Sequence, residues 1–220
     1  MPVEQKPFEE QIEKLIARIR REQLPENVFN LYQTTDPEFD ARGGAAKRRE
    51  NLRRYLKAIR EPEFALIGLA PGYRGARFTG VPFSDEARLC FPGSCYDRSS
   101  TRERPYREAS AGVVMDALNG STRIVCFNVV PWHPHRPNEP LSNADPNAET
   151  VKLGRGVLEW FFERLYPEVQ PVSVGRLAES VLAEMSPGAP HLPHPARGGA
   201  KEFRAGLLSL LAGPTADEEE

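Results

Sequence analysis

Three segments of this sequence each begin at, or just after, an apolar run that is typical of a buried strand. They are Ile67–Glu86, Val125–Pro137 and His194–Gly199. Open α/β folds place their sites at the carboxyl ends of parallel strands, so we expect all three segments to project from one end of a sheet. Together they supply a Gly-rich loop, an aromatic ring, two carboxylates, an amide and a histidine. That set suits the capture of a planar polar ring and the cleavage of a bond beside it.

Strands and helices alternate along the rest of the chain. Strands are expected at Phe64–Ala70, Arg123–Val130, Pro171–Gly175 and, shorter, within His191–Pro195. Helices are expected at Glu9–Arg21, Ala45–Arg60, Tyr106–Leu118, Ala148–Leu165, Arg176–Met185 and Glu202–Leu211. This alternation predicts an α/β fold, namely a three-layer α/β/α sandwich with a central four-stranded parallel sheet.

The length of 220 residues fits one domain, expected at residues 1–213, and an acidic tail at 214–220 that we expect to be disordered. No apolar run approaches the roughly 18 residues of a membrane helix, so no membrane association is expected. The polar N-terminus is unlike a signal peptide, and the three cysteines indicate a reducing compartment. We therefore expect a cytoplasmic, nucleoid-associated protein.

The residues that could bind a metal do not form a complete set. Cys90 and Cys95 have the spacing of some iron–sulfur ligands, but only one further cysteine exists. His133 and His135 resemble a metal pair, yet no carboxylate or cysteine sits at a usual ligand spacing. We expect no metal and no cofactor, and give His133 a structural or phosphate-contacting role.

The net charge of −2 hides two basic stretches. The first, Arg42–Arg60, is either a solvated helix face or a contact surface. The second, Arg74–Arg107, flanks the candidate site, which favours phosphate contacts there, with Arg74 and Arg77 foremost.

The loop GLAPGYRG follows the first strand directly. It lacks the GK[ST] ending of a P-loop and does not match GxGxxG. Its prolines and glycines predict a rigid turn whose N–H groups can face a carbonyl oxygen or a water. The alternative is an ordinary strand-to-helix connection.

Each candidate side chain also has an ordinary structural explanation. Phe83 can stack on a flat base or fill the core, and Asp85 and Glu86 can orient a water or begin a helix. Asn128, at the end of the second strand, offers the donor and acceptor that match the amide edge of a pyrimidine, but turn asparagines are common. His194 can donate to a developing anion or be a loop histidine.

The three segments resemble the signature regions of the uracil-DNA glycosylase superfamily, over about residues 27–211. GLAPGYRGARFTGVPF is similar to its first motif. The opening GLAP resembles the broad-specificity family first described from thermophiles, and TGVPF resembles the single-strand-selective monofunctional enzymes. VCFNVVP resembles the base-reading strand, and HPARGG resembles the HPS-type motif.

This resemblance implies a role for each candidate. Phe83 would stack on the base, Asn128 would read its amide edge, and His194 would stabilise the leaving anion. Glu86 lies where the GLAP-type enzymes place their catalytic acid, with Asp85 in reserve.

The resemblance also implies further contacts and a reaction. Base-binding residues would include Ala70, Pro71, Gly72 and Tyr73. DNA contacts would come from Arg74, Arg77, His133 and Arg197. The protein would be a monomeric, monofunctional base-excision repair enzyme. It would hydrolyse the N-glycosidic bond of a flipped uracil or other deaminated base in DNA, without a cofactor.

Two departures from the family pattern leave a rival open. Leu69 and Ala70 stand where many families carry a water-activating polar residue beside the proline of motif one. HPARGG lacks the serine and the leucine wedge, so Arg197 would have to fill the gap left by a flipped base. The alternative is a non-catalytic DNA-damage-binding module on the same fold.

Overall fold

A central parallel sheet organises the computed structural model, which describes residues 5–196 and 198–212. Its strand order is β3-β2-β5-β6. The strands are β2 (Phe64–Gly68), β3 (Ile124–Asn128), β5 (Gln170–Val174) and β6 (His191–Leu192). The register pairs Gly68 with Asn128 at the carboxyl ends of β2 and β3. The predicted four-stranded parallel sheet is confirmed.

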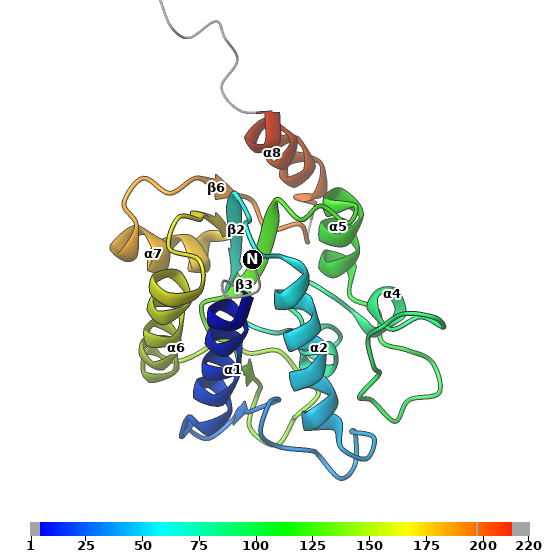
Figure 1. Ribbon diagram of the computed structural model, residues 1–220. Coiled ribbons are helices and arrows are strands. Elements are labelled where there is room, and N and C mark those ends of the chain that lie inside the picture. Colours follow the sequence, from blue (N-terminus) through cyan, green and yellow to red (C-terminus); the bar gives the residue numbers. More distant parts are fainter. Residues whose placement is uncertain (1–4, 197, 213–220) are drawn as a thin grey trace, which may run out of the picture.

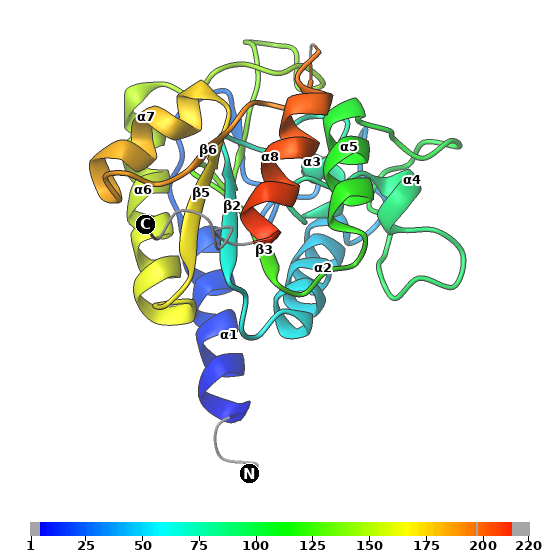
Figure 2. The ribbon, with the colours of Figure 1, turned by 90° about the horizontal axis from the view of Figure 1, so that it is seen from above.

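Helices cover both faces of this sheet (Figures 1 and 2). The longer ones are α1 (Gln5–Arg21), α2 (Gly44–Ala58), α5 (Ala109–Leu118), α6 (Ala148–Trp160), α7 (Arg176–Met185) and α8 (Ala200–Ala212). Short elements are α3 (Ala76–Thr79), α4 (Glu86–Leu89), the π-helical turn η1 (Phe161–Leu165), β1 (Val28–Phe29) and β4 (His133–Pro134). β1 pairs antiparallel with β4, apart from the main sheet.

Alternating side chains of the strands divide the apolar interior into two layers. Ala65 and Ile67 of β2 join a cluster with residues of α1, α2, α6, η1 and α7. Leu66, between them, joins Val114 of α5 and Phe203 of α8 on the other face. Figure 2 shows α5 and α8 side by side on that face. This is the expected three-layer α/β/α sandwich.

The observed elements differ from the predicted ones mainly around the site. The helix expected from Tyr106 begins at Ala109, because the N-cap residue Glu108 is extended (φ −121°, ψ 127°). The ring of Tyr106 instead stacks on Phe78, with centroids 4.5 Å apart. The tail predicted at 214–220 lies outside the described residues. No helix in the described ranges has the length and apolarity needed to cross a bilayer.

A buried ion network anchors the segment before α2 to the first motif. Asp40 accepts hydrogen bonds from Arg48 of α2 at 2.8 Å and from Arg77 of α3 at 2.7 Å, and all three side chains are at most 1% exposed. Arg48 also donates to the backbone carbonyls of Leu31 and Thr34. The network therefore joins α2, α3 and the long connection before them.

Other basic side chains of α2 are also occupied within the molecule. Arg53 pairs with Glu13 and Glu50, and Lys57 pairs with Glu9 at 3.0 Å. Of the two explanations for the stretch Arg42–Arg60, these pairs favour a helix face satisfied by the protein itself over a DNA contact surface.

Asp40→Ala should lower the free energy of unfolding by about 3–5 kcal/mol, because it leaves two buried guanidinium groups without a counter-charge. Urea unfolding measures the loss, with the exposed Glu38→Ala as the matched control. A loss no larger than that of the control would show that the network does not anchor this region.

Candidate functional site

The predicted stacking ring and base-reading amide meet at Gly68. A β-carbon on Gly68 would lie 2.6 Å from Cζ of Phe83 and 2.7 Å from Oδ1 of Asn128, so glycine is required there. Both side chains therefore close over the end of β2, although 45 residues separate them in the chain. Phe83 has a φ of +54°, in the left-handed region that a bulky residue rarely adopts. Such strain is typical of functional sites.

The amide of Asn128 is in position to read a ligand. The residue is 5% exposed, and within the described part of the chain its side chain forms no hydrogen bond to another protein group. A nearly buried amide without partners costs free energy, which a ligand with a complementary donor and acceptor would recover.

Backbone bonds beyond the strands hold the first two motifs together. The N–H of Val129 donates to the carbonyl of Gly68 at 2.8 Å, and that of Val130 donates to Leu69 at 2.9 Å. Gly154 of α6 packs directly against the carbonyl of Val129, where a side chain would collide. The loop that includes Ala70, Pro71, Gly72 and Tyr73 is thus placed beside Asn128.

His133 supports this loop from inside the protein. Its Nδ1 lies 2.7 Å from the carbonyl of Pro71, and the residue is 0% exposed. Burial, assisted by the charge of Arg77, lowers the pKa of His133 to about 4, so the ring is neutral at pH 7 and Nδ1–H donates to that carbonyl. The expected DNA contact through His133 is corrected, because no DNA can reach it in this position.

Arg77 is corrected for the same reason. Its side chain is 1% exposed and its Nη1 donates to Asp40, with the guanidinium 4.0 Å from the ring centroid of Phe29. It is an internal ion-pair partner and not a surface phosphate contact. Arg74, four residues after Ala70, is exposed and keeps the role that its sequence position indicated.

The two predicted acids are both buried and occupied. Oε1 of Glu86 accepts from the backbone N–H groups of Ser99 and Ser100, at 3.1 and 2.9 Å, and Oε2 accepts from the Ser100 hydroxyl. Asp85 caps α4 by accepting from the N–H of Arg88, and also accepts from the N–H of Glu108. In this structure both carboxylates hold loops in place, and the catalytic role expected for one of them stays a prediction.

Glu108 is a carboxylate that sequence reasoning missed. Its two oxygens lie against Gly72 and Gly75 of the first motif, where a β-carbon on either glycine would overlap them. Gly75 in turn contacts the carbonyl of Ser84, next to Phe83. Burial, followed by the negative charge of Asp85, raises the pKa of Glu108 to about 7, and Arg74 opposes the shift. The sequence marks Glu108 only as a glutamate directly before an apolar helical run, which does not indicate a site.

The third motif lies next to the end of β5. A β-carbon on Gly175 would be 3.2 Å from Cβ of His194. His194 is exposed, and its Nδ1 accepts a hydrogen bond from the N–H of Ala196 at 3.2 Å. Arg197, which we expected to fill the gap that a flipped base leaves in the DNA stack, lies outside the described residues.

Comparison with known proteins adds a likeness in fold. The chain resembles the crystal structure of wild-type SMUG2 from Pedobacter heparinus, with a TM-score of 0.62 and 12% sequence identity. The match covers 92% of this chain and 95% of that one. No family model matches the sequence, and no curated protein matches it. The two proteins share a fold.

The likeness extends over nearly the whole of both chains. At 12% identity it establishes the architecture, and the site residues must be judged by their own contacts. Those contacts bring together Phe83, Asn128 and the loop of the first motif, with His194 at the neighbouring strand end.

Glu86→Gln separates a structural role from a catalytic one. The glutamine NH₂ is a donor and would face donors of Ser99 and Ser100. We therefore expect the free energy of unfolding to fall by about 1.5–3 kcal/mol, the usual contribution of a hydrogen bond to a charged group. Urea unfolding of this variant is compared with that of the exposed Glu103→Gln. Unchanged stability together with lost excision would instead identify Glu86 as the catalytic acid.

Proposed function

We propose that this protein is a monofunctional DNA glycosylase that removes uracil, or another deaminated base, from DNA. The observation that carries the proposal is the meeting of the Phe83 ring and the Asn128 amide at Gly68. The three-motif resemblance supports it, as does the fold shared with SMUG2, a member of the uracil-DNA glycosylase superfamily.

Recognition would follow from the chemistry of these two side chains. A base flipped out of the DNA stack would lie on the ring of Phe83. The NH₂ of Asn128 would donate to O4 of uracil, and its Oδ1 would accept from N3–H. Cytosine presents the opposite pattern at these two atoms, so an amide fixed in this orientation would reject it.

Cleavage would then proceed by hydrolysis. The C1′–N bond breaks with its electron pair moving to the base, and a water oxygen forms the new bond to C1′. One water proton stays on the new C1′ hydroxyl, and the other leaves through the assisting acceptor and ends on the departing base, so the DNA is left with an abasic sugar. Nε2–H of His194 would stabilise the anionic base, a role in which one donor is typically worth ~3–4 kcal/mol.

Glu108 would supply the carboxylate that motif one lacks. Its carboxylate lies against Gly72 and Gly75, in and just after the loop that contains Ala70, and a pKa of about 7 leaves a large fraction ionised at neutral pH. An acid–base group tuned near the working pH is effective both in accepting and in releasing a proton. Asp85 and Glu86 are less suited, since their oxygens already accept bonds from the protein.

A second candidate is a damage-binding module without catalytic activity. It is favoured by the structural use of Asp85 and Glu86 and by the apolar Leu69 and Ala70 in motif one. Single-turnover assays on uracil-containing oligonucleotides, followed by alkali and gel resolution, separate the two. Cleavage at uracil supports the enzyme, and tight binding without cleavage supports the module.

Asn128→Asp tests recognition. The substitution places a second acceptor where a donor is needed, so uracil excision should fall by about tenfold to a hundredfold, in line with the roughly 1–3 kcal/mol cost of an unmatched polar group. Cytosine excision is measured in parallel, because the aspartate matches its N4 amine when it is an acceptor. Asn138→Asp, in an exposed loop, is the control. Full uracil excision by Asn128→Asp would contradict the proposed base reading.

Glu108→Gln tests the carboxylate through its pH dependence. In the wild type, excision should rise with pH as Glu108 ionises near pH 7, and the variant should lose about a hundredfold in rate and this rise. Stability gives a second readout. A carboxyl with a folded pKa above its unfolded value loses stability as pH rises from about 4.5 to 7.

The variant should therefore show a flatter stability profile over that range, whatever its activity. Glu103→Gln, on the exposed loop nearby, provides the control for both measurements. If Glu108→Gln flattened the stability profile but kept full excision, the raised pKa would be confirmed and the catalytic role would be wrong.

A further inference from the structure

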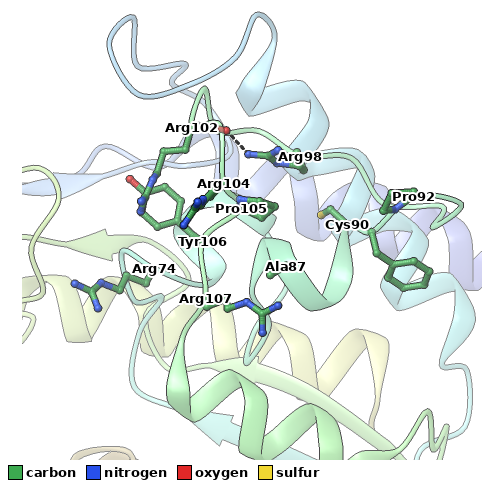
Figure 3. A pocket seen from close by; sticks show the side chains of 11 residues that line it. Arg74, Ala87, Cys90, Pro92, Arg98, Arg102, Arg104, Pro105, Tyr106 and Arg107 are labelled. Atoms are coloured by element: carbon green, nitrogen blue, oxygen red, sulfur yellow. Dashed lines mark hydrogen bonds between the residues drawn. The ribbon is translucent and has the colours of Figure 1, made fainter.

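A cavity of about 950 Å³ lies beside the first motif, between α4 and the loops that follow it. Its volume is at the upper end of the ~300–1,000 Å³ usual for ligand sites. None of the described residues that line it is acidic. Five arginines line it (Figure 3): Arg74, Arg98, Arg102, Arg104 and Arg107.

Most of these arginines form no ion pair with the described residues. Among the described residues, Arg102, Arg104 and Arg107 form no ion pair, whereas Arg98 lies 3.7 Å from Glu86. Several like charges around one hollow repel one another, and an anion placed among them relieves that repulsion. The walls of the cavity are therefore suited to phosphate groups.

Aromatic side chains accompany the arginines. Phe91 lines the cavity and is 56% exposed, which the packing of the core does not require. Tyr106 also lines the cavity but is only 5% exposed, because its ring stacks on Phe78 and the guanidinium of Arg102 lies 4.6 Å from its centroid (Figure 3). Phe91 is therefore the ring that remains open to a ligand, and an exposed aromatic ring among basic residues is typical of surfaces on which nucleic-acid bases stack.

The cavity adjoins the proposed catalytic loop. Arg74 belongs to the first motif and also lines the cavity, and Arg107 directly precedes Glu108. A DNA strand with its target base on Phe83 would have neighbouring phosphates within reach of this opening. The cavity itself is separate from the Phe83–Asn128 pair, because neither residue lines it.

From these observations we infer that the cavity is a second nucleotide site, which holds a nucleotide next to the flipped one. Arg102, Arg104 and Arg107 bind its phosphates, and its base leaves the stack to lie on Phe91. This inference rests on the proposed function for the identity of the strand, but the site itself needs no damaged base.

Binding without catalysis provides the test. Fluorescence anisotropy measures the affinity of short oligothymidylates, which contain no uracil, at a series of salt concentrations. Arg102→Gln combined with Arg104→Gln should weaken binding about tenfold or more and lower the salt slope by roughly 1.4, at about 0.7 for each single-strand phosphate contact. Arg18→Gln with Arg164→Gln, two exposed arginines of α1 and η1, should change neither.

The base contact is tested by a double-mutant cycle between protein and DNA. Abasic spacers replace one base at a time, so each phosphate remains while its base is lost. At one position the spacer should cost the wild type about tenfold, within the range for a stacked base, and should cost Phe91→Ala nothing further. Phe91→Tyr keeps a ring and should restore the coupling, and Leu208→Ala is an exposed apolar control.

Unchanged affinity and salt slope in the double arginine variant would overturn the site. Spacer losses that are equal in wild type and Phe91→Ala would overturn the nucleotide assignment and leave only a backbone contact. If Phe91 and the spacer position are coupled but the protein never excises uracil, the nucleotide site is upheld and the proposed glycosylase activity is refuted. Failure of the site and failure of the proposed function therefore give different results.

Discussion

The parallel pairing of β2 with β3 is the interaction on which the site depends. It sets Gly68 opposite Asn128, and it continues past both strands through the bonds from Val129 to Gly68 and from Val130 to Leu69. Because the loops leave the sheet already joined, the first and second motifs cannot move apart without breaking the ladder. Because Gly68 has no side chain, the Phe83 ring and the Asn128 amide can both approach its α-carbon closely. A base-sized ligand would meet a surface that is fixed before it binds.

Buried charged and polar side chains hold the loops in place. Asp40, Asp85 and Glu86 each accept several hydrogen bonds, at least one of them from a distant part of the chain, and His133 holds the carbonyl of Pro71. Loops cannot rely on their own secondary structure for rigidity, so polar anchors under them are a physical substitute. The consequence is that most ionisable groups near the motifs are structural. Glu108 differs, because its carboxylate lies against the motif-one loop with a raised pKa.

The sheet, and the gathering of the motif segments at one of its ends, could be predicted because both depend on local patterns, whereas the roles of Phe83 and Asn128 came from the family resemblance. Short apolar runs indicate parallel strands, and residues at strand ends gather at one edge of a sheet. The acids could not be assigned in this way. Whether Glu86 faces solvent or the Ser99–Ser100 backbone depends on a loop that returns to it from further along the chain. Glu108 likewise reaches Gly72 only through folding, and nothing in its immediate neighbourhood in the sequence indicates that contact.

The arginines show how a chain of net charge −2 can still attract a polyanion. On α2 and on the outer helices, basic side chains such as Arg53 and Arg155 are neutralised by glutamates of their own or neighbouring helices. Around the cavity, Arg102, Arg104 and Arg107 form no ion pair with any described residue, so positive charge gathers at an opening beside the first motif. Association depends on this local field more than on the net charge. The screening length in about 0.1 M salt is about 10 Å, so charges further away than that contribute little. A slightly acidic chain with a hollow of this kind would therefore attract a polyanion at that opening rather than over its surface as a whole.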